Sequence, residues 1–269
     1  MASDNRTTEH TQSVDGRTAL VTGASAGIGR ATALALAAKG ADVALLARST
    51  EELSSLAGEI DSRYPGDALA VECDVQNPGR VEEAIETTVE EFDGLDIVVC
   101  NTGTTGAGFE DRLEQQSLDD YHQVVETNIN GTFYTTSAAL PYLREANGNI
   151  IFVGSSAGKL PRPGNPVYAA SKWWMRGFAL SVEAHVGRDG VAVTLLNPTA
   201  VRTDMWRDKL DRGQAAEPEE VAAQVINAAE QPPHSTLSEI DLFRRDMLGT
   251  FVPEEIDLSI PFDRNGDDR

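Results

Sequence analysis

Three side chains in the middle of the chain have the types and spacing needed to move a proton to or from an oxygen atom. Tyr168 and Lys172 stand four residues apart, and Ser155 lies thirteen residues before the tyrosine. Residues four apart share one face of a helix, so the phenol and the ammonium can point into one cavity. A nearby ammonium lowers the pKa of a tyrosine, and a serine hydroxyl can orient a substrate oxygen. The spacing predicts acid–base chemistry on a carbonyl or alcohol, although Tyr-x-x-x-Lys alone is more typical of an ordinary helix.

A glycine-rich turn near the N-terminus predicts a dinucleotide site. Residues 17–22 have the pattern of a buried strand, and Gly23-Ala-Ser-Ala-Gly27-Ile-Gly29 follows at once. Residues 30–39 then carry helix formers and apolar residues at helical spacing, closed by Gly40. Between a strand and a helix, glycines let the backbone approach a pyrophosphate, and the helix N-terminus offers unpaired N–H groups. The alternative is a tight turn without a ligand.

Taken together, these motifs resemble the short-chain dehydrogenase/reductase family in its single-domain form. The resemblance runs from about residue 16 to about residue 203 and rests on the glycine turn with Ser155, Tyr168 and Lys172. It implies a catalytic tetrad completed by Asn128. In that tetrad Tyr168 is the general acid/base, Lys172 lowers its pKa and holds the nicotinamide ribose, and Ser155 orients the substrate oxygen. Asn128 would anchor a water that relays protons, and an asparagine that kinks a buried helix fits the same position.

The resemblance also implies which residues contact the cofactor. They come from the glycine turn, from the ends of the following strands, from the tetrad and from the segment after residue 197: Gly23, Ser25, Gly27, Ile28, Gly29, Arg48, Asp74, Val75, Asn101, Gly103, Tyr168, Lys172, Pro198, Val201 and Thr203. Two stretches depart from the family pattern. Cys100 and Thr102 replace two residues of an Asn-Asn-Ala-Gly motif, and Thr199 stands where the family usually has a glycine beside the nicotinamide.

The end of the second predicted strand favours NADP(H) over NAD(H). NAD-preferring enzymes usually have an acidic residue there for the ribose 2′-hydroxyl, whereas a basic residue accommodates a 2′-phosphate. Here that position is Ala47, and Arg48 follows it. Ala26, however, stands where many NADP-users of the family carry a second basic residue. A solvated surface charge is the alternative interpretation of Arg48.

The rest of the chain predicts a single-domain α/β fold, a Rossmann-type doubly wound parallel sheet of about seven strands with helices on both faces. Strand-like apolar runs and helical patterns alternate; the runs lie at 41–47, 68–73, 97–100, 149–153 and 191–196, and the helical patterns at 51–63, 80–92, 118–144 and 166–186. A shorter strand near 239–243 would close one edge. We expect the domain to span residues 16–250, between a disordered polar leader (1–15) and an acidic tail (251–269).

The charge of the chain is strongly negative. A net charge of −21 and 43 acidic against 22 basic residues argue against nucleic-acid binding, because such a surface repels phosphate. Four of the basic residues are lysines. Abundant acidic residues with scarce lysine predict a halophilic protein of a haloarchaeon, whose self-repulsion is screened at high salt. An ordinary acidic mesophilic enzyme is the alternative.

Other features bear on assembly and location. We expect Cys73 and Cys100 to be buried free thiols in preference to a disulfide or metal site, and the four histidines show no metal-ligand spacing. No run reaches membrane-spanning length or resembles a signal peptide, which predicts a cytoplasmic protein without membrane association. The aromatic residues of 173–178 exceed what one core-facing stripe needs. They predict a homo-oligomer, and the family commonly forms dimers that pair into tetramers.

The substrate is expected to be a small carbonyl compound or alcohol. Its pocket would be formed by the loops at 104–109, 156–165 and 200–210, where Met205 and Trp206 suggest an apolar lid or simple packing. The acidic surface favours an uncharged ketone, although Arg162 and Arg202 could anchor one carboxylate, and enzymes that reduce 3-oxoacyl thioesters share all these motifs. The alternative function is a catalytically silent NADP-binding redox sensor, against which the intact tetrad argues.

Overall fold

Seven parallel strands form the central sheet, in the order β3-β2-β1-β4-β5-β6-β7. This computed structural model describes residues 12–106, 113–203 and 215–245. The strands are β1 (Thr18–Thr22), β2 (Asp42–Ala47), β3 (Ala68–Glu72), β4 (Ile97–Cys100), β5 (Asn149–Val153), β6 (Ala192–Pro198) and β7 (Glu239–Leu242). The strand order reverses between β1 and β4, which is where open α/β sheets bind ligands. The predicted Rossmann-type fold is confirmed, including the short seventh strand at one edge.

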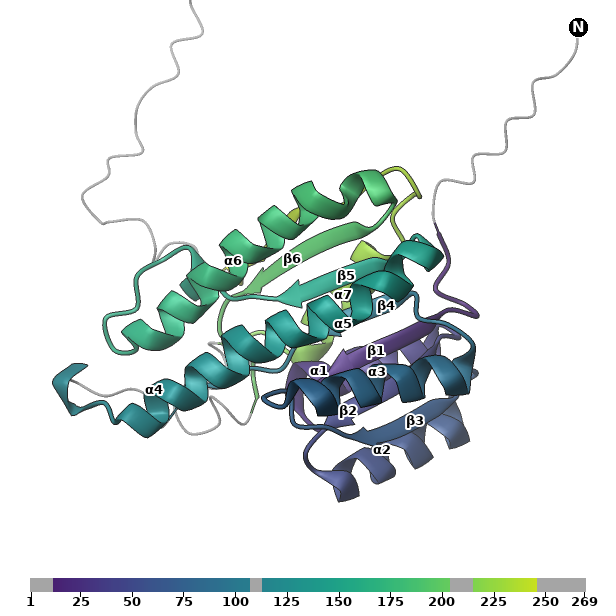
Figure 1. The fold of residues 1–269 in the computed structure, drawn as a ribbon, viewed down its shortest axis with the longest axis horizontal. Helices are drawn as coiled ribbons and strands as arrows, with labels where there is room; N and C mark the ends of the chain where they lie inside the picture. The colour runs from purple at the N-terminus through teal and green to yellow at the C-terminus, as the bar shows by residue number, and fades with distance from the viewer. Residues whose placement is uncertain (1–11, 107–112, 204–214, 246–269) are drawn as a thin grey trace, which may run out of the picture.

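Helices cover both faces of the sheet (Figure 1). On one face α1 (Gly27–Ala38), α2 (Thr50–Arg63) and α7 (Pro218–Ala229) share a core with the strands. On the other face, toward the viewer in Figure 1, α3 (Pro78–Phe92), α5 (Gly131–Ala146) and α6 (Pro166–Val186) form a second core. Because both faces are covered, β1, β4 and β5 are buried at every position, which explains their nearly continuous apolar sequences.

The predicted helix over 118–144 is interrupted. It consists of α4 (Leu118–Val124), a π-helical turn (Val125–Asn130) and then α5, which continues to Ala146. A π-helical turn inserts one extra residue into the helical ladder, and such turns are frequent at functional sites. Hydrophobic periodicity alone does not distinguish this break from a continuous helix.

Helix α7 is not among the predicted helices. Its start carries a helix signal, because Pro218 occupies the first position and the Glu220 side chain accepts a hydrogen bond from the Glu217 backbone N–H (2.7 Å). Its buried residues include Val221 and Val225, which pack in the same core as α1.

The packed domain begins before the expected boundary at residue 16. Val14 is fully buried in the core beside α1, and the backbone N–H of Gln12 donates to the carbonyl of Glu230 (3.2 Å). Residues 1–11 of the predicted leader, the predicted tail at 251–269 and the proposed lid residues Met205 and Trp206 lie outside the described residues.

The two cysteines lie at the carboxyl ends of two strands that are not adjacent in the sheet. Cys73 directly follows β3 and Cys100 ends β4, and both are buried free thiols. Burial raises the pKa of Cys73 to about 11 and that of Cys100 to about 12. Both thiols therefore stay protonated at neutral pH. None of the described helices combines the length and apolarity needed to cross a membrane.

Candidate active site

The turn after β1 requires glycine at three positions. Gly23 and Gly27 have φ angles of 67° and 53°, which side chains with a Cβ rarely adopt. A Cβ on Gly29 would lie 2.2 Å from the carbonyl oxygen of Gly23, so this residue permits the helix to start directly against the turn. Ser25 lies within the turn, and Ile28, in the first turn of α1, packs against the core.

The start of α1 is suited to an anion. Ala26 occupies the N-cap without a side-chain hydrogen bond, and the first turn contains no acidic residue. The N–H groups of that turn are therefore not capped by a side chain, and the helix dipole favours negative charge there. These features fit the pyrophosphate of a dinucleotide.

The end of β4 is hydrogen-bonded to the glycine turn. Asn101 donates through Nδ2 to the carbonyl of Thr22 (2.9 Å), and the Thr22 hydroxyl accepts from the backbone N–H groups of Asn101 (3.0 Å) and Thr102 (3.1 Å). Thr102 uses its backbone here, so its departure from the family pattern leaves this bracing intact. Thr22 was not among the predicted site residues, and a threonine ending a strand gives no signal that would single it out.

The segment after β6 closes against the same turn. A Cβ on Gly27 would lie 2.9 Å from Cγ2 of Thr203, which places that threonine beside the glycines. Pro198 ends β6, and Val201 is buried and bridges to Ala216. The Thr199 hydroxyl donates to the carbonyl of Leu242 (3.3 Å) at the end of β7. This β-branched side chain is therefore directed toward the edge strand.

The remaining predicted cofactor residues follow the neighbouring strands. Arg48 is exposed directly after β2. Asp74 accepts a hydrogen bond from the backbone of Gln76 (3.1 Å). Val75 is buried against α5, because a Cβ on Gly131 would lie 2.7 Å from its Cγ2 atom. These residues lie at the carboxyl ends of β2 and β3, where the sequence placed them.

Lys172 is buried in α6 and directed toward β5. Its Nζ donates to the carbonyl of Val153 (2.9 Å) and lies 6.0 Å from the centre of the Tyr168 ring. Burial lowers the pKa of the Lys172 ammonium to about 8. A Cβ on Gly103 would lie 3.6 Å from both Lys172 Nζ and Asn128 Oδ1, so these two polar groups border the same space beside the glycine.

The environment of Tyr168 differs from the sequence-based expectation. Burial raises the pKa of the Tyr168 phenol, while a hydrogen bond with Ser155 and the charge of Arg162 lower it. Lys172 is not among the causes of this pKa shift; its ammonium donates to the carbonyl of Val153 and lies 6.0 Å from the centre of the Tyr168 ring. Ser155 lies just after β5, and its hydroxyl also accepts from the backbone N–H of Ala157 (3.1 Å).

Asn128 joins the loop after β4 to α6. Its Oδ1 accepts from the backbone N–H of Thr104 (2.8 Å), and its Nδ2 donates to the carbonyl of Thr104 (2.9 Å) and to the Ser171 hydroxyl (2.9 Å). It lies in the π-helical turn and is fully buried. The π-helical turn interrupts the helix at Asn128 and places the amide between two segments of the site.

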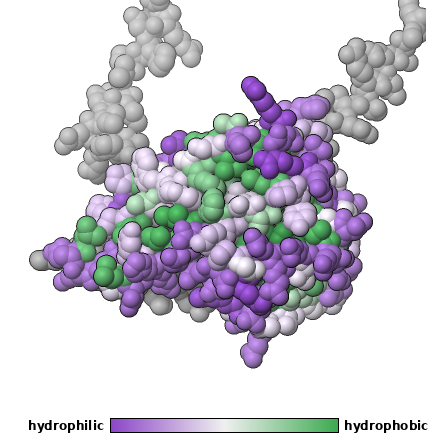
Figure 2. Space-filling model, in the orientation of Figure 1, coloured by the Kyte–Doolittle hydropathy of each residue, from purple (hydrophilic) through white to green (hydrophobic). Residues whose placement is uncertain are grey.

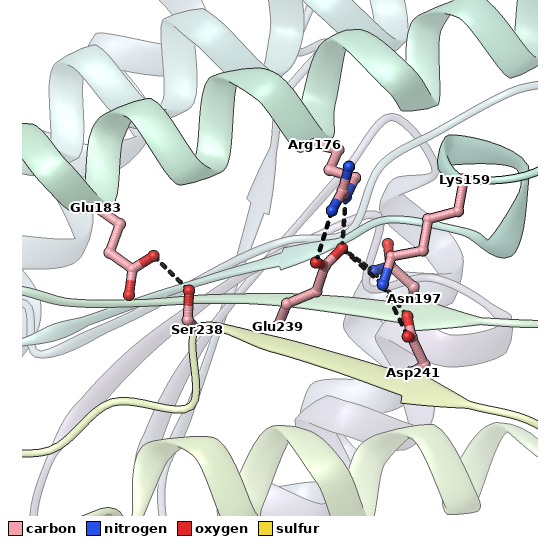
Figure 3. A network of polar contacts seen from close by, with 7 residues as sticks. All are labelled: Lys159, Arg176, Glu183, Asn197, Ser238, Glu239 and Asp241. Carbon is pink, nitrogen blue, oxygen red and sulfur yellow. Dashed lines mark hydrogen bonds and ion pairs between the residues drawn. The ribbon is translucent and has the colours of Figure 1, made fainter.

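A network of hydrogen bonds and ion pairs connects α6, through Arg176, to the edge strand β7 (Figure 3). Arg176 makes two hydrogen bonds to the carboxylate of Glu239 (2.8 and 3.1 Å). Lys159, just beyond Ser155, pairs with Glu239 (3.1 Å) and Asp241 (2.7 Å). Asn197 also donates to Glu239 (2.8 Å). The network thus connects the serine segment, the tyrosine helix and β6 to the edge strand, and its hydrogen bonds, above all those from Arg176, lower the pKa of Glu239 to about 2.

A glycine turn at the reversal of strand order, in a sheet whose helix α6 carries the buried Tyr168 and Lys172, is typical of dinucleotide-dependent oxidoreductases. The chain belongs to the short-chain dehydrogenase family, whose model, described as short chain dehydrogenase, matches residues 17–213. It is therefore an oxidoreductase, and its family membership is consistent with CH–OH/C=O chemistry on a nicotinamide cofactor. A 3-oxoacyl-[acyl-carrier-protein] reductase of Synechocystis is 35% identical over 224 residues, 80% of this chain and 89% of the relative.

Solved structures agree with this assignment. A short chain dehydrogenase from Burkholderia cenocepacia in complex with NADP superposes with a TM-score of 0.77 at 30% identity, covering 86% of this chain and 98% of that one. An alcohol dehydrogenase from the archaeon Thermococcus sibiricus, complexed with 5-hydroxy-NADP, has a TM-score of 0.78 at 30% identity, with coverages of 84% and 95%. A 3-ketoacyl-(acyl-carrier-protein) reductase from Brucella melitensis, complexed with NADH, has a TM-score of 0.77 at 27% identity, with coverages of 85% and 97%.

Proposed function

We propose that the protein is an NADPH-dependent reductase of ketones or 3-oxoacyl compounds, with Tyr168 as the general acid/base. The observation that carries this proposal is that Ser155, directly after β5, lies close enough to the buried phenol of Tyr168 to lower its pKa, so one substrate oxygen can contact both hydroxyl groups. The cofactor, when bound, supplies the hydride to the carbonyl carbon or accepts it from the alcohol.

The side chains of the site divide the remaining work. Tyr168 donates its proton to the carbonyl oxygen, and burial helps because it keeps the phenol protonated until the substrate oxygen becomes basic. Ser155 donates a hydrogen bond to the same oxygen and stabilises the charge that develops there. Lys172, with its pKa near neutrality, is suited to return a proton to Tyr168 after each turnover.

Asn128 has a positioning role in this scheme. Its amide bonds to Thr104 and Ser171 hold the loop after β4 against the catalytic helix. Its place beside Lys172, across Gly103, supports the relay in which a water near Asn128 connects the lysine to solvent. The four residues Asn128, Ser155, Tyr168 and Lys172 would then act as one catalytic tetrad.

Preference for NADP(H) rests on Arg48. Its exposed side chain follows β2 at the position where a cation can meet a ribose 2′-phosphate, and no acidic residue occupies the strand end. The glycine turn would hold the pyrophosphate, with Asp74 and Val75 near the adenine and Pro198, Val201 and Thr203 near the nicotinamide. One structural neighbour is complexed with NADP and another with NADH, so the fold does not decide between the two cofactors. The proposed preference therefore rests on this chain's own residues.

An exposed aromatic surface supports assembly into a homodimer or homotetramer. Figure 2 shows apolar side chains gathered on the face that carries α5 and α6. There Phe133 and Trp173 are each 48% exposed, and Trp174 stacks on Phe178 with ring centres 4.7 Å apart. Burial of this surface by a second copy would remove apolar area from water. The proposal also includes a cytoplasmic location in a haloarchaeal cell with a salt-rich cytoplasm, supported by the net charge of −21.

The decisive experiment measures initial rates with NADPH and with NADH against a panel of ketones, aldehydes and 3-oxoacyl thioesters in multimolar KCl. We expect turnover with NADPH to exceed that with NADH, and Tyr168→Phe to lose about 10²–10⁴-fold in rate. Tyr64→Phe is a matched control, because Tyr64 packs against the core beyond α2. Near-full activity of Tyr168→Phe would refute the acid/base assignment. Tight NADPH binding without turnover would favour the redox sensor instead.

A further inference from the structure

Arg162 is held close to the proposed catalytic residues by two sets of contacts. Its Nη2 donates to the hydroxyl of Ser156 (2.8 Å), the buried neighbour of Ser155. Its carbonyl accepts from the backbone N–H of Asn165 (3.0 Å), which closes a turn directly before α6. Asn165 in turn caps this helix by accepting from the backbone N–H of Tyr168 (3.1 Å). Hydrogen bonds through Asn165 therefore connect the turn that carries Arg162 to the helix turn that carries Tyr168.

The charge of Arg162 is not neutralised by a carboxylate in the part of the chain that the structure describes. Its side chain is half-buried, and its hydrogen bond to Ser156 is made with a neutral hydroxyl. By contrast, Arg176 pairs with Glu239, and Arg202 pairs with Glu217 (2.8 Å). The chain has 43 acidic and 22 basic residues, so carboxylates are more numerous than the cations that could pair with them. A half-buried guanidinium without a carboxylate partner is therefore unexpected in this chain. Its fork of donors suits one planar anion.

We infer that Arg162 binds a carboxylate carried by the substrate, and that the preferred substrates are oxo acids with this carboxylate a few bonds from the reacting carbonyl. The inference rests on the proposed function, because it assumes that the carbonyl oxygen meets Tyr168 and Ser155. The carboxylate is bound and left unchanged, while the carbonyl carbon receives the hydride and its oxygen receives the proton. Of the two arginines considered from the sequence, Arg202 is already neutralised by Glu217 and is not assigned this role.

The electrostatic reach of Arg162 supports this position. Its positive charge lowers the pKa of the Tyr168 phenol against the effect of burial, so the guanidinium lies near the group that would protonate the substrate. An anion bound to Arg162 would therefore lie on the same side of the site as a carbonyl oxygen placed between Tyr168 and Ser155. Pairing with the Arg162 guanidinium would also offset the repulsion between the substrate carboxylate and the acidic surface of the protein.

The test compares 4-oxopentanoate with its methyl ester as substrates. We expect the wild-type kcat/KM for the acid to exceed that for the ester, and Arg162→Gln to reduce this ratio about 10- to 100-fold, as for loss of a charge-assisted hydrogen bond. The ratio cancels any effect on Tyr168 that is common to both substrates. Arg162→Lys should retain part of the preference, and Arg202→Gln, the matched control, should leave it unchanged.

Two results would overturn the inference. One is an equal loss for acid and ester in Arg162→Gln, which would mean that the arginine serves only the structure of its loop. The other is a wild-type enzyme that prefers the ester.

Calorimetric titration of 4-oxopentanoate into protein saturated with NADP+ separates this inference from the proposed function, because it needs no turnover. We expect binding that weakens at least about tenfold in Arg162→Gln and is unchanged in Arg202→Gln. Equal affinity of Arg162→Gln and the wild type would exclude the anchor even if the enzyme reduces ketones. Anchoring without turnover on any substrate would leave the anion site standing while the reductase proposal fails.

Discussion

Replacing Lys172 by methionine should make the protein more stable at neutral pH while removing its activity. Burial lowers the pKa of this ammonium from an ordinary value of 10.5 to about 8. The unfolded chain therefore binds more protons than the folded protein between these two pH values, and stability rises with pH across that window. Below pH 8 the full cost of burying the charge is present.

The size of the effect follows from the pKa shift. Each pKa unit corresponds to about 1.4 kcal/mol, so burying the charge costs about 3 kcal/mol at pH 7. Methionine removes this cost but leaves the carbonyl of Val153, now bonded to Lys172 Nζ, without its partner. A buried unsatisfied carbonyl costs about 1–2 kcal/mol. The net gain expected for Lys172→Met is therefore about 1–2 kcal/mol.

Urea unfolding of both proteins at fixed salt, from pH 7 to pH 10.5, measures this directly. The advantage of the variant should shrink as pH rises through the window, because the lysine of the folded wild type then loses its proton and with it the cost of a buried charge. Lys39→Met is the control, since Lys39 is exposed and paired with Glu230, so it should show no such trend. A variant less stable than the wild type at pH 7, or a difference independent of pH, would refute the reasoning.

Three further predictions concern the turn, the edge network and the net charge. Gly29→Ala should weaken NADPH binding at least about tenfold and destabilise the fold by about 1–3 kcal/mol, because its Cβ would lie 2.2 Å from the Gly23 carbonyl oxygen. An unchanged calorimetric affinity together with an unchanged free energy of unfolding would contradict this. The pKa of Glu239 is lowered to about 2, so its stabilising pairs with Arg176 and Lys159 are fully present above pH 4.5 and are lost as pH falls toward 2. Glu239→Gln should therefore lower the free energy of unfolding above pH 5 and have little effect near pH 2; a pH-independent difference in urea titrations would argue against it. Because like charges repel at a net charge of −21, the thermal midpoint should rise from 0.1 M to multimolar KCl, and a midpoint that stays level would exclude halophilic stabilisation.

The fold was largely predictable because its signals are local. Both β4 and β5 are apolar runs whose observed bounds match the predicted ones, and the glycine turn identifies itself by its place between strand and helix. The positions of Tyr168 and Lys172 follow from helical spacing. Their electrostatics do not, since the direction of the lysine depends on the carbonyl of Val153, nineteen residues away.

Contacts between distant segments were beyond the reach of sequence patterns. Arg176 and Glu239 are 63 residues apart and meet only because β7 joins the edge of the sheet under α6. That Arg162 has no carboxylate partner among the described residues also cannot be read from sequence, because nothing local distinguishes it from Arg202, which pairs with Glu217. The π-helical turn around Asn128 preserves apolar spacing on both sides and so leaves no periodic signal.

The two buried thiols allow local opening of the structure to be measured by the rate of thiol labelling. Cys73 and Cys100 are almost fully buried, and their raised pKa values keep them protonated, so a thiol reagent can label them only when the surrounding structure opens. Cys73 follows the outer strand β3, whereas Cys100 ends β4 next to the site. Their separate labelling rates would thus compare opening at the sheet edge with opening at its centre, without any engineered probe.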